Sequence, residues 1–184
     1  MPGLERMPDV AFRLMVFVMA VRDFVYPFID KQVATFGIRK DMTVVDYGCG
    51  PGRYTTRFSE LVGPNGKVYA VDVQKLAIEM VKRRMAEQGL RNIVPMLAQG
   101  YKTGIPDHVA DVVCAIDIFF GVGEPTTFLK EIHRITRPDG FLIIDDGHQS
   151  RQETLRKIEA AGYWRIAEET HDHLKCLPLN QNIA

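Results

Sequence analysis

Residues 44–54 combine a short apolar run with three closely spaced glycines, in the order Val-Val-Asp-Tyr-Gly-Cys-Gly-Pro-Gly-Arg-Tyr. The two valines favour a strand, and the glycines allow a tight turn in which bare backbone approaches a ligand closely. Pro51 suits the first turn of a helix that follows. This stretch therefore predicts a β-strand, a binding loop and an α-helix, which is the start of an α/β fold.

The spacing of the glycines indicates which class of ligand the loop can bind. It reads Gly-x-Gly-x-Gly, and Arg53 stands where a dinucleotide-binding fingerprint has its last glycine. Asp72 follows Gly50 by 22 residues, at the end of a predicted strand, where a carboxylate can accept hydrogen bonds from ribose hydroxyls. Capping a helix or forming a turn is the alternative role for Asp72. The loop therefore suits a nucleoside-bearing ligand, although the pyrophosphate fingerprint is incomplete.

Strands and helices alternate along the rest of the chain. The strands are expected at 43–46, 67–72, 93–97, 110–116 and, after a Pro-Asp-Gly turn, 141–145. The helices are expected at 52–62, 74–88, 126–136 and 152–161. This alternation predicts right-handed crossovers and a mostly parallel sheet with helices on both faces.

The last two predicted strands, 163–170 and 173–177, are separated by only two residues, which requires an antiparallel hairpin. We therefore expect a Rossmann-like, mostly parallel seven-stranded α/β sheet that ends in an antiparallel hairpin.

Composition excludes several classes of partner. The 184 residues carry 23 basic and 23 acidic side chains without a Lys/Arg cluster, which argues against a nucleic-acid partner. The three cysteines are odd in number and widely spaced, so they predict neither a disulfide framework nor a metal site, and they fit a reducing cytoplasm. A chain of this length is most simply one domain, 1–184, with an α/β core at 36–178.

The N-terminal segment needs separate treatment because residues 10–29 are largely apolar. Its longest unbroken apolar run, 14–21, has eight residues, whereas a bilayer span needs ~20. No small-residue cleavage site follows the run, so a signal peptide is not indicated. We expect residues 1–35 to form a helical cap or lid over the core, with shallow peripheral membrane contact or a dimer contact as alternatives.

Three stretches together resemble the class I S-adenosylmethionine-dependent methyltransferases, in particular the small-molecule branch that includes the quinone-biosynthesis enzymes. They are 44–52, 68–72 (Val-Tyr-Ala-Val-Asp) and 131–140 (Glu-Ile-His-Arg-Ile-Thr-Arg-Pro-Asp-Gly). The resemblance covers residues 36–175. It implies a seven-stranded sheet with a closing hairpin, S-adenosylmethionine as cofactor, and methyl transfer to a small molecule.

The resemblance also implies roles for individual residues. It places Gly48, Gly50 and Gly52 along the methionine portion of the cofactor, with Asp46 near the amino group of that portion through water. It places Asp72 on the ribose hydroxyls and Val73 on the adenine. Asp117 would face the methionine moiety and the transferred methyl. Gly100 and Tyr101 fall where the family has an acid for the adenine amino group. This chain has no acid there, and Gln99 offers only an amide oxygen.

Fewer residues predict how the chain binds the acceptor, which is the molecule that receives the methyl group. An oxygen nucleophile needs a base, and His148, Asp117 and Asp146 follow predicted strands; His148 has the most suitable ordinary pKa. The alternative for His148 is a loop imidazole bonded to backbone. Phe119 and Phe120, with the apolar N-terminal helix, favour an apolar or aromatic acceptor, although such residues also commonly belong to the core.

His171 and His173 fall in the predicted hairpin turn and are expected to meet solvent. Two other functions remain open. They are a non-catalytic S-adenosylmethionine-binding or S-adenosylhomocysteine-binding protein, and an NAD-dependent oxidoreductase, which Arg53 disfavours.

Overall fold

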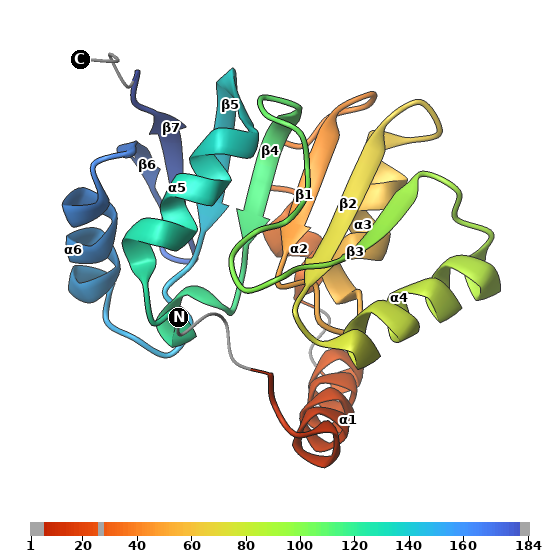
Figure 1. Ribbon diagram of the computed structural model, residues 1–184. Coiled ribbons are helices and arrows are strands. Elements are labelled where there is room, and N and C mark those ends of the chain that lie inside the picture. Colours follow the sequence, from red (N-terminus) through yellow and green to blue (C-terminus); the bar gives the residue numbers. More distant parts are fainter. Residues whose placement is uncertain (1–5, 26–27, 181–184) are drawn as a thin grey trace.

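The computed structural model describes residues 6–25 and 28–180, in which a seven-stranded sheet carries helices on both faces (Figure 1). The strands are β1 (Thr43–Tyr47), β2 (Lys67–Asp72), β3 (Ile93–Leu97), β4 (Ala110–Ala115), β5 (Thr136–Ile144), β6 (Trp164–Glu169) and β7 (Leu174–Pro178). The helices are α1 (Asp9–Val25), α2 (Ile29–Val33), α3 (Arg53–Val62), α4 (Lys75–Gln88), α5 (Pro125–Ile135) and α6 (Arg151–Ala161), with a short 3₁₀ turn at Phe119–Gly121.

The strand order is β3-β2-β1-β4-β5-β7-β6. The first five strands are parallel, and β7 runs antiparallel to both β5 and β6. The predicted mostly parallel sheet with a closing antiparallel hairpin is therefore confirmed. The order reverses between β1 and β4, and in sheets of this kind the crevice outside the carboxyl ends at such a reversal is where ligands bind.

Alternation along the strands builds two cores, one on each face of the sheet. In β1, Val44 packs with α2, α3 and α4, while its neighbour Val45 faces the cluster that includes α5 and α6. Val112 and Val113 divide between the two faces in the same way. Successive side chains of a strand point to opposite faces, so the central strands are apolar throughout.

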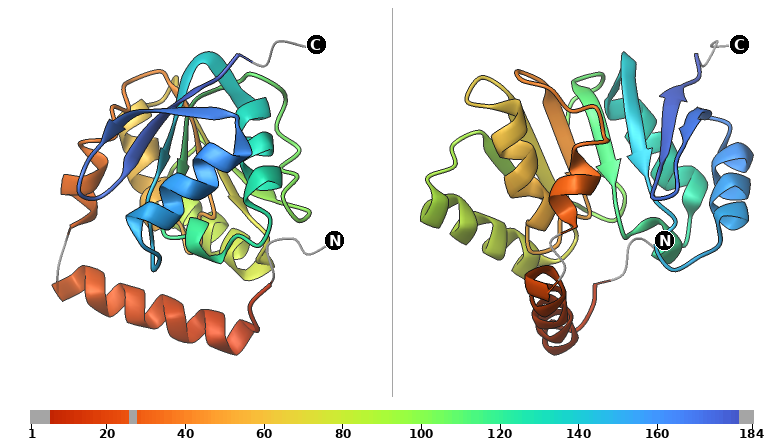
Figure 2. Two further views of the ribbon diagram at one scale, coloured as in Figure 1. Left: turned by 90° about the vertical axis from the view of Figure 1, so that its left-hand side faces the viewer. Right: turned by 180° about the vertical axis from the view of Figure 1, so that it is seen from behind.

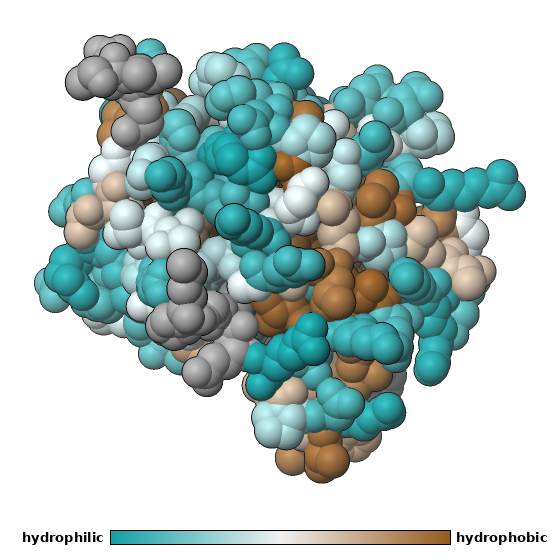
Figure 3. All heavy atoms as spheres, viewed as in Figure 1, coloured by the Kyte–Doolittle hydropathy of each residue, from teal (hydrophilic) through white to brown (hydrophobic). Residues whose placement is uncertain are grey.

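Helix α1 is set apart from these layers and lies across the carboxyl ends of the strands (Figures 1 and 2). Phe12 is buried against the body of the protein, whereas a stripe on the other side of the helix is exposed. The stripe comprises Val10, Leu14, Phe17, Val18 and Val21. It contributes to the apolar surface of α1 at the bottom of Figure 3. Among the described residues, no helix is both long and apolar enough to cross a membrane.

Two local predictions are wrong. The fifth strand begins at Thr136, directly after α5, and not after the Pro-Asp-Gly turn, because Thr136 already pairs with Ala110 before the register shifts to Phe141 opposite Val112. His173 is buried and not exposed. Its ring packs edge-on against Phe36 at 5.0 Å between centroids, and burial lowers its pKa.

Candidate functional site

The glycine loop leaves β1 at the reversal of the sheet and enters α3. Gly48 and Gly52 both have φ of 82°, and Gly50 has φ of 50°, a backbone region that side chains disfavour. A Cβ on Gly48 would lie 2.4 Å from Cδ1 of Ile118, so a side chain at this position would displace the Ile118 side chain. A Cβ on Gly50 would meet nothing within 4 Å, which leaves the backbone there open to a ligand.

Asp72 fixes this loop from the end of β2. Its Oδ2 accepts a hydrogen bond from the Gly50 N–H at 2.9 Å, and its Oδ1 accepts one from the Gln74 N–H at 2.8 Å. Burial raises the pKa of Asp72, and the backbone hydrogen bonds oppose that shift. Each carboxylate oxygen keeps a further lone pair for a ligand hydroxyl.

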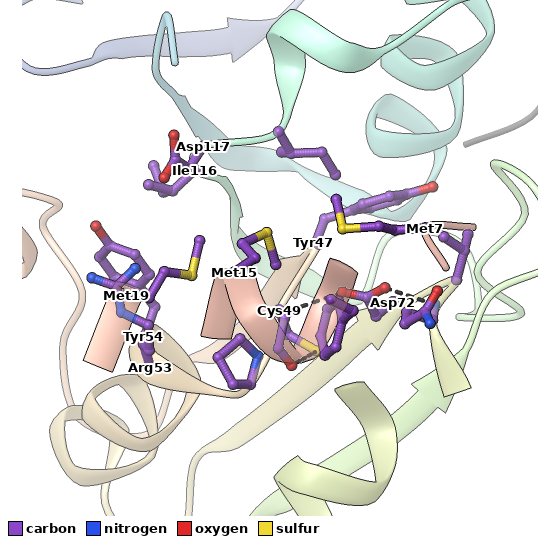
Figure 4. Close-up of a pocket in the computed structure, with 17 residues that line it drawn as sticks. Met7, Met15, Met19, Tyr47, Cys49, Arg53, Tyr54, Asp72, Ile116 and Asp117 are labelled. Carbon is purple, nitrogen blue, oxygen red and sulfur yellow. Dashed lines mark hydrogen bonds between the residues drawn. The ribbon is translucent and has the colours of Figure 1, made fainter. Parts of the chain in front are cut away.

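A cavity of about 200 Å³ opens between this loop, the end of β4 and α1. Its walls are Met7, Phe12, Met15, Met19, Tyr47, Gly48, Cys49, Gly50, Pro51, Arg53, Tyr54, Asp72, Val73, Gln74, Ile116, Asp117 and Ile118. Figure 4 shows Met7 near Asp72 at one end, and Met19 near Tyr54 at the other. Met7 and the underside of α1 therefore roof the cavity together.

Asp117 stands at the end of the cavity away from Asp72 (Figure 4). It has a φ of 61°, which is strained for a non-glycine residue. Its N–H donates to Oδ1 of Asp145 at 2.8 Å. Burial raises the pKa of Asp145 to about 7, and the charges of Asp117 and Asp146 add to that effect.

A second, more polar recess adjoins this end of the cavity and shares Tyr54, Ile116 and Asp117 with it. Its remaining walls are Arg22, Phe28, Gln32, Asp145, Asp146, Gly147, His171 and Asp172. The cavity is therefore mostly apolar, whereas the adjoining recess is polar and carries the carboxylates Asp145, Asp146 and Asp172.

Five of the residues predicted for the site line the cavity, namely Gly48, Gly50, Asp72, Val73 and Asp117. Asp46 lies behind the loop. It is only 3% exposed, and its Oδ2 accepts a hydrogen bond from the Thr55 hydroxyl at 2.5 Å. Burial raises the pKa of Asp46 to about 7, against that hydrogen bond. Asp46 thus holds the first turn of α3 to β1.

The other predicted residues also lie outside the cavity walls. Gly52 is the N-cap of α3. Gly100 lies in the turn after β3, and the neighbouring Tyr101 is buried, with its hydroxyl accepting from the Glu124 N–H at 3.0 Å. His148 is exposed and packs edge-on against Phe120, with 4.8 Å between ring centroids.

Phe119 and Phe120 do not form the acceptor pocket. Phe119 is fully buried in the core beside Phe128, and Phe120 is 39% exposed. The apolar walls come instead from Ile118 and from the methionines of α1. The apolar composition of residues 10–29 signalled that helix, but nothing in the pattern indicated which of its side chains face the cavity. Gln74 was missed as well, because no motif marks it.

The loop at the sheet reversal, the acid closing β2 and the terminal hairpin define a class I S-adenosylmethionine-dependent methyltransferase fold. Residues 38–176 match the family model described as a methyltransferase domain, and the chain belongs to that family. S-adenosylmethionine is the cofactor of this class. The residues present fit it, because Gly50 is open toward the cavity, Asp72 offers acceptors, and the buried Oε1 of Gln74 lacks a partner among the described residues.

Relatives with known names agree with this class. The chain is 31% identical over 109 residues to a demethylmenaquinone methyltransferase of Geobacillus stearothermophilus, an alignment that covers 58% of this chain and 45% of the relative. It is 26% identical over 123 residues to a ubiquinone/menaquinone biosynthesis C-methyltransferase of Shewanella sp. (strain W3-18-1), covering 66% and 49%. The chain thus spans about half the length of the curated relatives it matches.

Among solved structures, an S-adenosylmethionine-dependent methyltransferase from Aquifex aeolicus superposes with a TM-score of 0.77 at 27% identity. The superposition covers 82% of this chain and 89% of that one. The resemblance to quinone-biosynthesis methyltransferases and the expected fold are therefore both confirmed.

Proposed function

We propose that this chain transfers a methyl group from S-adenosylmethionine to a small, apolar or aromatic acceptor held beneath α1. The observation that carries the proposal is the cavity itself. It joins the glycine loop and Asp72 to a roof of methionine side chains and ends at Asp117. Methionine adapts its shape to irregular apolar ligands, which suits a roof that closes over an aromatic molecule.

Asp72 and the glycine loop form the cofactor half. Asp72 would hold the ribose hydroxyls through the lone pairs left after its two backbone hydrogen bonds. Val73 would pack on the adenine, and the open backbone at Gly50 would pass close to the methionine portion. Asp46 supports this half from behind, through Thr55 of α3.

Asp117 marks the reacting end. When bound, S-adenosylmethionine supplies an electrophilic methyl on its sulfonium, so the chain's main task is to hold a nucleophile in line and to exclude water. Ile116, Ile118 and Met19 provide apolar walls there. These walls would orient a flat acceptor and keep water from the reacting atoms.

An acceptor that loses a proton needs a group to receive it. Asp145 lines the adjoining recess, and its pKa of about 7 leaves a usable ionised fraction at neutral pH. Asp117 lies between that carboxyl and the cavity. His148 stays a candidate base from the sequence, but its exposed ring lies outside both spaces, which favours the two aspartates.

The names of the relatives guide the choice of acceptor. Two of them are quinone-biosynthesis methyltransferases, which makes reduced naphthoquinones and benzoquinones the first compounds to test. The proposed cap, residues 1–35, contains α1, and we propose that such a molecule enters the cavity when α1 lifts.

We do not expect this chain to bind a nucleic acid.

The test is transfer of label from methyl-labelled S-adenosylmethionine to a panel of apolar and aromatic acceptors, read by mass spectrometry. We expect a methylated product that disappears in Asp72→Ala. Tight binding of S-adenosylhomocysteine without transfer to any acceptor would instead indicate a non-catalytic binder. Binding of NAD in preference to S-adenosylmethionine, measured by calorimetry, would refute the cofactor.

A further inference from the structure

Gln74 connects the cofactor loop to the helix that roofs it. It is the N-cap residue of α4, yet its side chain makes no cap hydrogen bond. Its backbone N–H donates to Oδ1 of Asp72 at 2.8 Å, and its side-chain Nε2 donates to Oδ1 of Asp9 at 2.8 Å. Asp9 is the first residue of α1, 65 residues away in sequence.

The other half of the same amide has nothing to bond. Gln74 is only 5% exposed and lines the cavity, and its Oε1 is buried without a hydrogen-bond partner among the described residues. The orientation of the amide follows from its neighbour. A carboxylate only accepts, so Nε2 must face Asp9 and Oε1 must face away from it. A buried acceptor left in this state costs free energy that a donor would recover.

We propose that Gln74 is a cofactor-binding residue that also latches α1. Its Oε1 accepts a hydrogen bond from an O–H or N–H donor on the nucleoside half of the cofactor, while Nε2 holds Asp9 and so keeps α1 closed. The inference rests on the proposed use of S-adenosylmethionine and adds a coupling between cofactor binding and the position of α1.

The coupling follows from whether Oε1 of Gln74 has a hydrogen-bond donor in the closed form without ligand and in the closed form with ligand. With α1 closed and no ligand, Oε1 is sealed away from water without a partner. With the nucleoside bound in the cavity that Gln74 lines, Oε1 gains a donor while Nε2 keeps its hydrogen bond to Asp9. The ligand therefore binds the closed form more tightly and shifts α1 toward it. A single recovered hydrogen bond corresponds to a preference on the order of tenfold.

The size of the cavity agrees with this mechanism. Its volume of about 200 Å³ is below the ~300–1,000 Å³ of typical small-molecule sites. Met7 precedes α1 and lines the Asp72 end of the cavity. A ligand with both a nucleoside and an amino acid portion would need α1 to lift before it enters, and the latch would then close behind it.

The experiment measures two quantities on the full chain, the affinity for S-adenosylhomocysteine and the hydrogen exchange of α1 amides with and without that ligand. Gln74→Met keeps the length of the side chain but removes both polar atoms. We expect it to weaken binding about tenfold or more and to abolish ligand-dependent protection of α1. Asp9→Ala should weaken binding less and likewise make α1 exchange independent of ligand.

Asp9→Asn separates the hydrogen bond from the charge at the helix N-terminus, because its amide oxygen still accepts from Nε2. We expect Asp9→Asn to keep the ligand-dependent protection that Asp9→Ala loses. Arg13→Ala, an exposed position on the same helix, is the matched control and should behave as the wild type. Asp9 is also exposed, so its variants test the latch even if Gln74→Met fails to fold.

Each contrary result has one meaning. Wild-type affinity in a folded Gln74→Met would refute the contact with the nucleoside. Equal loss of protection in Asp9→Asn and Asp9→Ala would refute the hydrogen-bonded latch, as would retained protection in Asp9→Ala. A wild-type protein that fails to bind S-adenosylhomocysteine would instead refute the proposed cofactor.

Discussion

Replacing Asp72 by asparagine tests the cofactor site more sharply than removing the side chain. Both carboxylate oxygens accept a backbone N–H, from Gly50 at 2.9 Å and from Gln74 at 2.8 Å. Asparagine has one acceptor oxygen, so its NH₂ must face one of these donors. The substitution that looks conservative therefore disturbs the loop geometry as well as the proposed ribose contact.

The expected loss can be estimated from these contacts. A hydrogen bond to a charged acceptor contributes about 1.5–3 kcal/mol, so losing one ribose contact of that kind weakens binding roughly 10- to 150-fold. Folding stability should change less. Burial raises the pKa of Asp72, which shows that the carboxylate is costly to desolvate, and a neutral amide relieves that cost. We expect the two effects on folding to offset to within about 1 kcal/mol.

The assay is calorimetric titration with S-adenosylhomocysteine, with thermal unfolding of each variant recorded in parallel. Asp111→Asn is the matched control. Asp111 also accepts a backbone hydrogen bond, from the Thr43 N–H at 2.7 Å, but it lies at the start of β4, at the opposite end of the sheet. An Asp72→Asn protein that binds within threefold of the wild type, or an equal loss in Asp111→Asn, would refute the ribose assignment.

Three further predictions follow from the site. The pKa of Asp46, raised by burial to about 7, gives stability that is present below pH 3.8 and is lost as pH rises through 7. The unfolding free energy should therefore rise by about 2–3 kcal/mol between pH 8 and pH 5, and chemical denaturation of Asp46→Asn should show a flatter profile. Gly48→Ala should weaken binding of S-adenosylhomocysteine, because its Cβ would displace the Ile118 side chain and its positive φ costs about 1–2 kcal/mol; adding Ile118→Ala should restore only the part due to that displacement. Met19→Gln should raise KM for an apolar acceptor several-fold while leaving KM for S-adenosylmethionine within twofold, and equal changes in both would contradict the division of the cavity.

The features that could be predicted from sequence are those that local physics dictates. The run from Val44 to Gly52 fixes a strand, a left-handed loop and a helix start, because few other sequences tolerate those backbone angles. The two-residue gap before His173 requires an antiparallel hairpin. The place of Asp72 beside Gly50 agrees with the rule that the carboxyl ends of parallel strands meet at one edge of the sheet, whereas the strand order comes from the structure alone.

The features that were missed depend on contacts between distant segments. His173 looks like a turn residue until Phe36 packs on its ring, and Phe119 looks like a pocket wall until Phe128 stacks against it. No sequence motif marks Gln74 as a site residue, because its side chain bonds to Asp9, which is 65 residues away in the sequence. Periodicity reports which residues are buried but not which partners bury them.

Most of the predicted cavity residues belong to the half proposed for the cofactor, whereas the methionines of α1, which were missed, roof the cavity from outside the family match. The family match begins at residue 38, so it contains the glycine loop, Asp72 and Asp117 but none of α1. Met15 and Met19, which line the cavity from α1, lie outside it. A shared cofactor keeps one loop geometry across a family, whereas each acceptor needs its own apolar roof. Acceptor selectivity in this chain should therefore follow substitutions in α1, and exchanging that helix for the equivalent segment of a relative should change the acceptor while leaving the affinity for S-adenosylhomocysteine within a few-fold of the wild type.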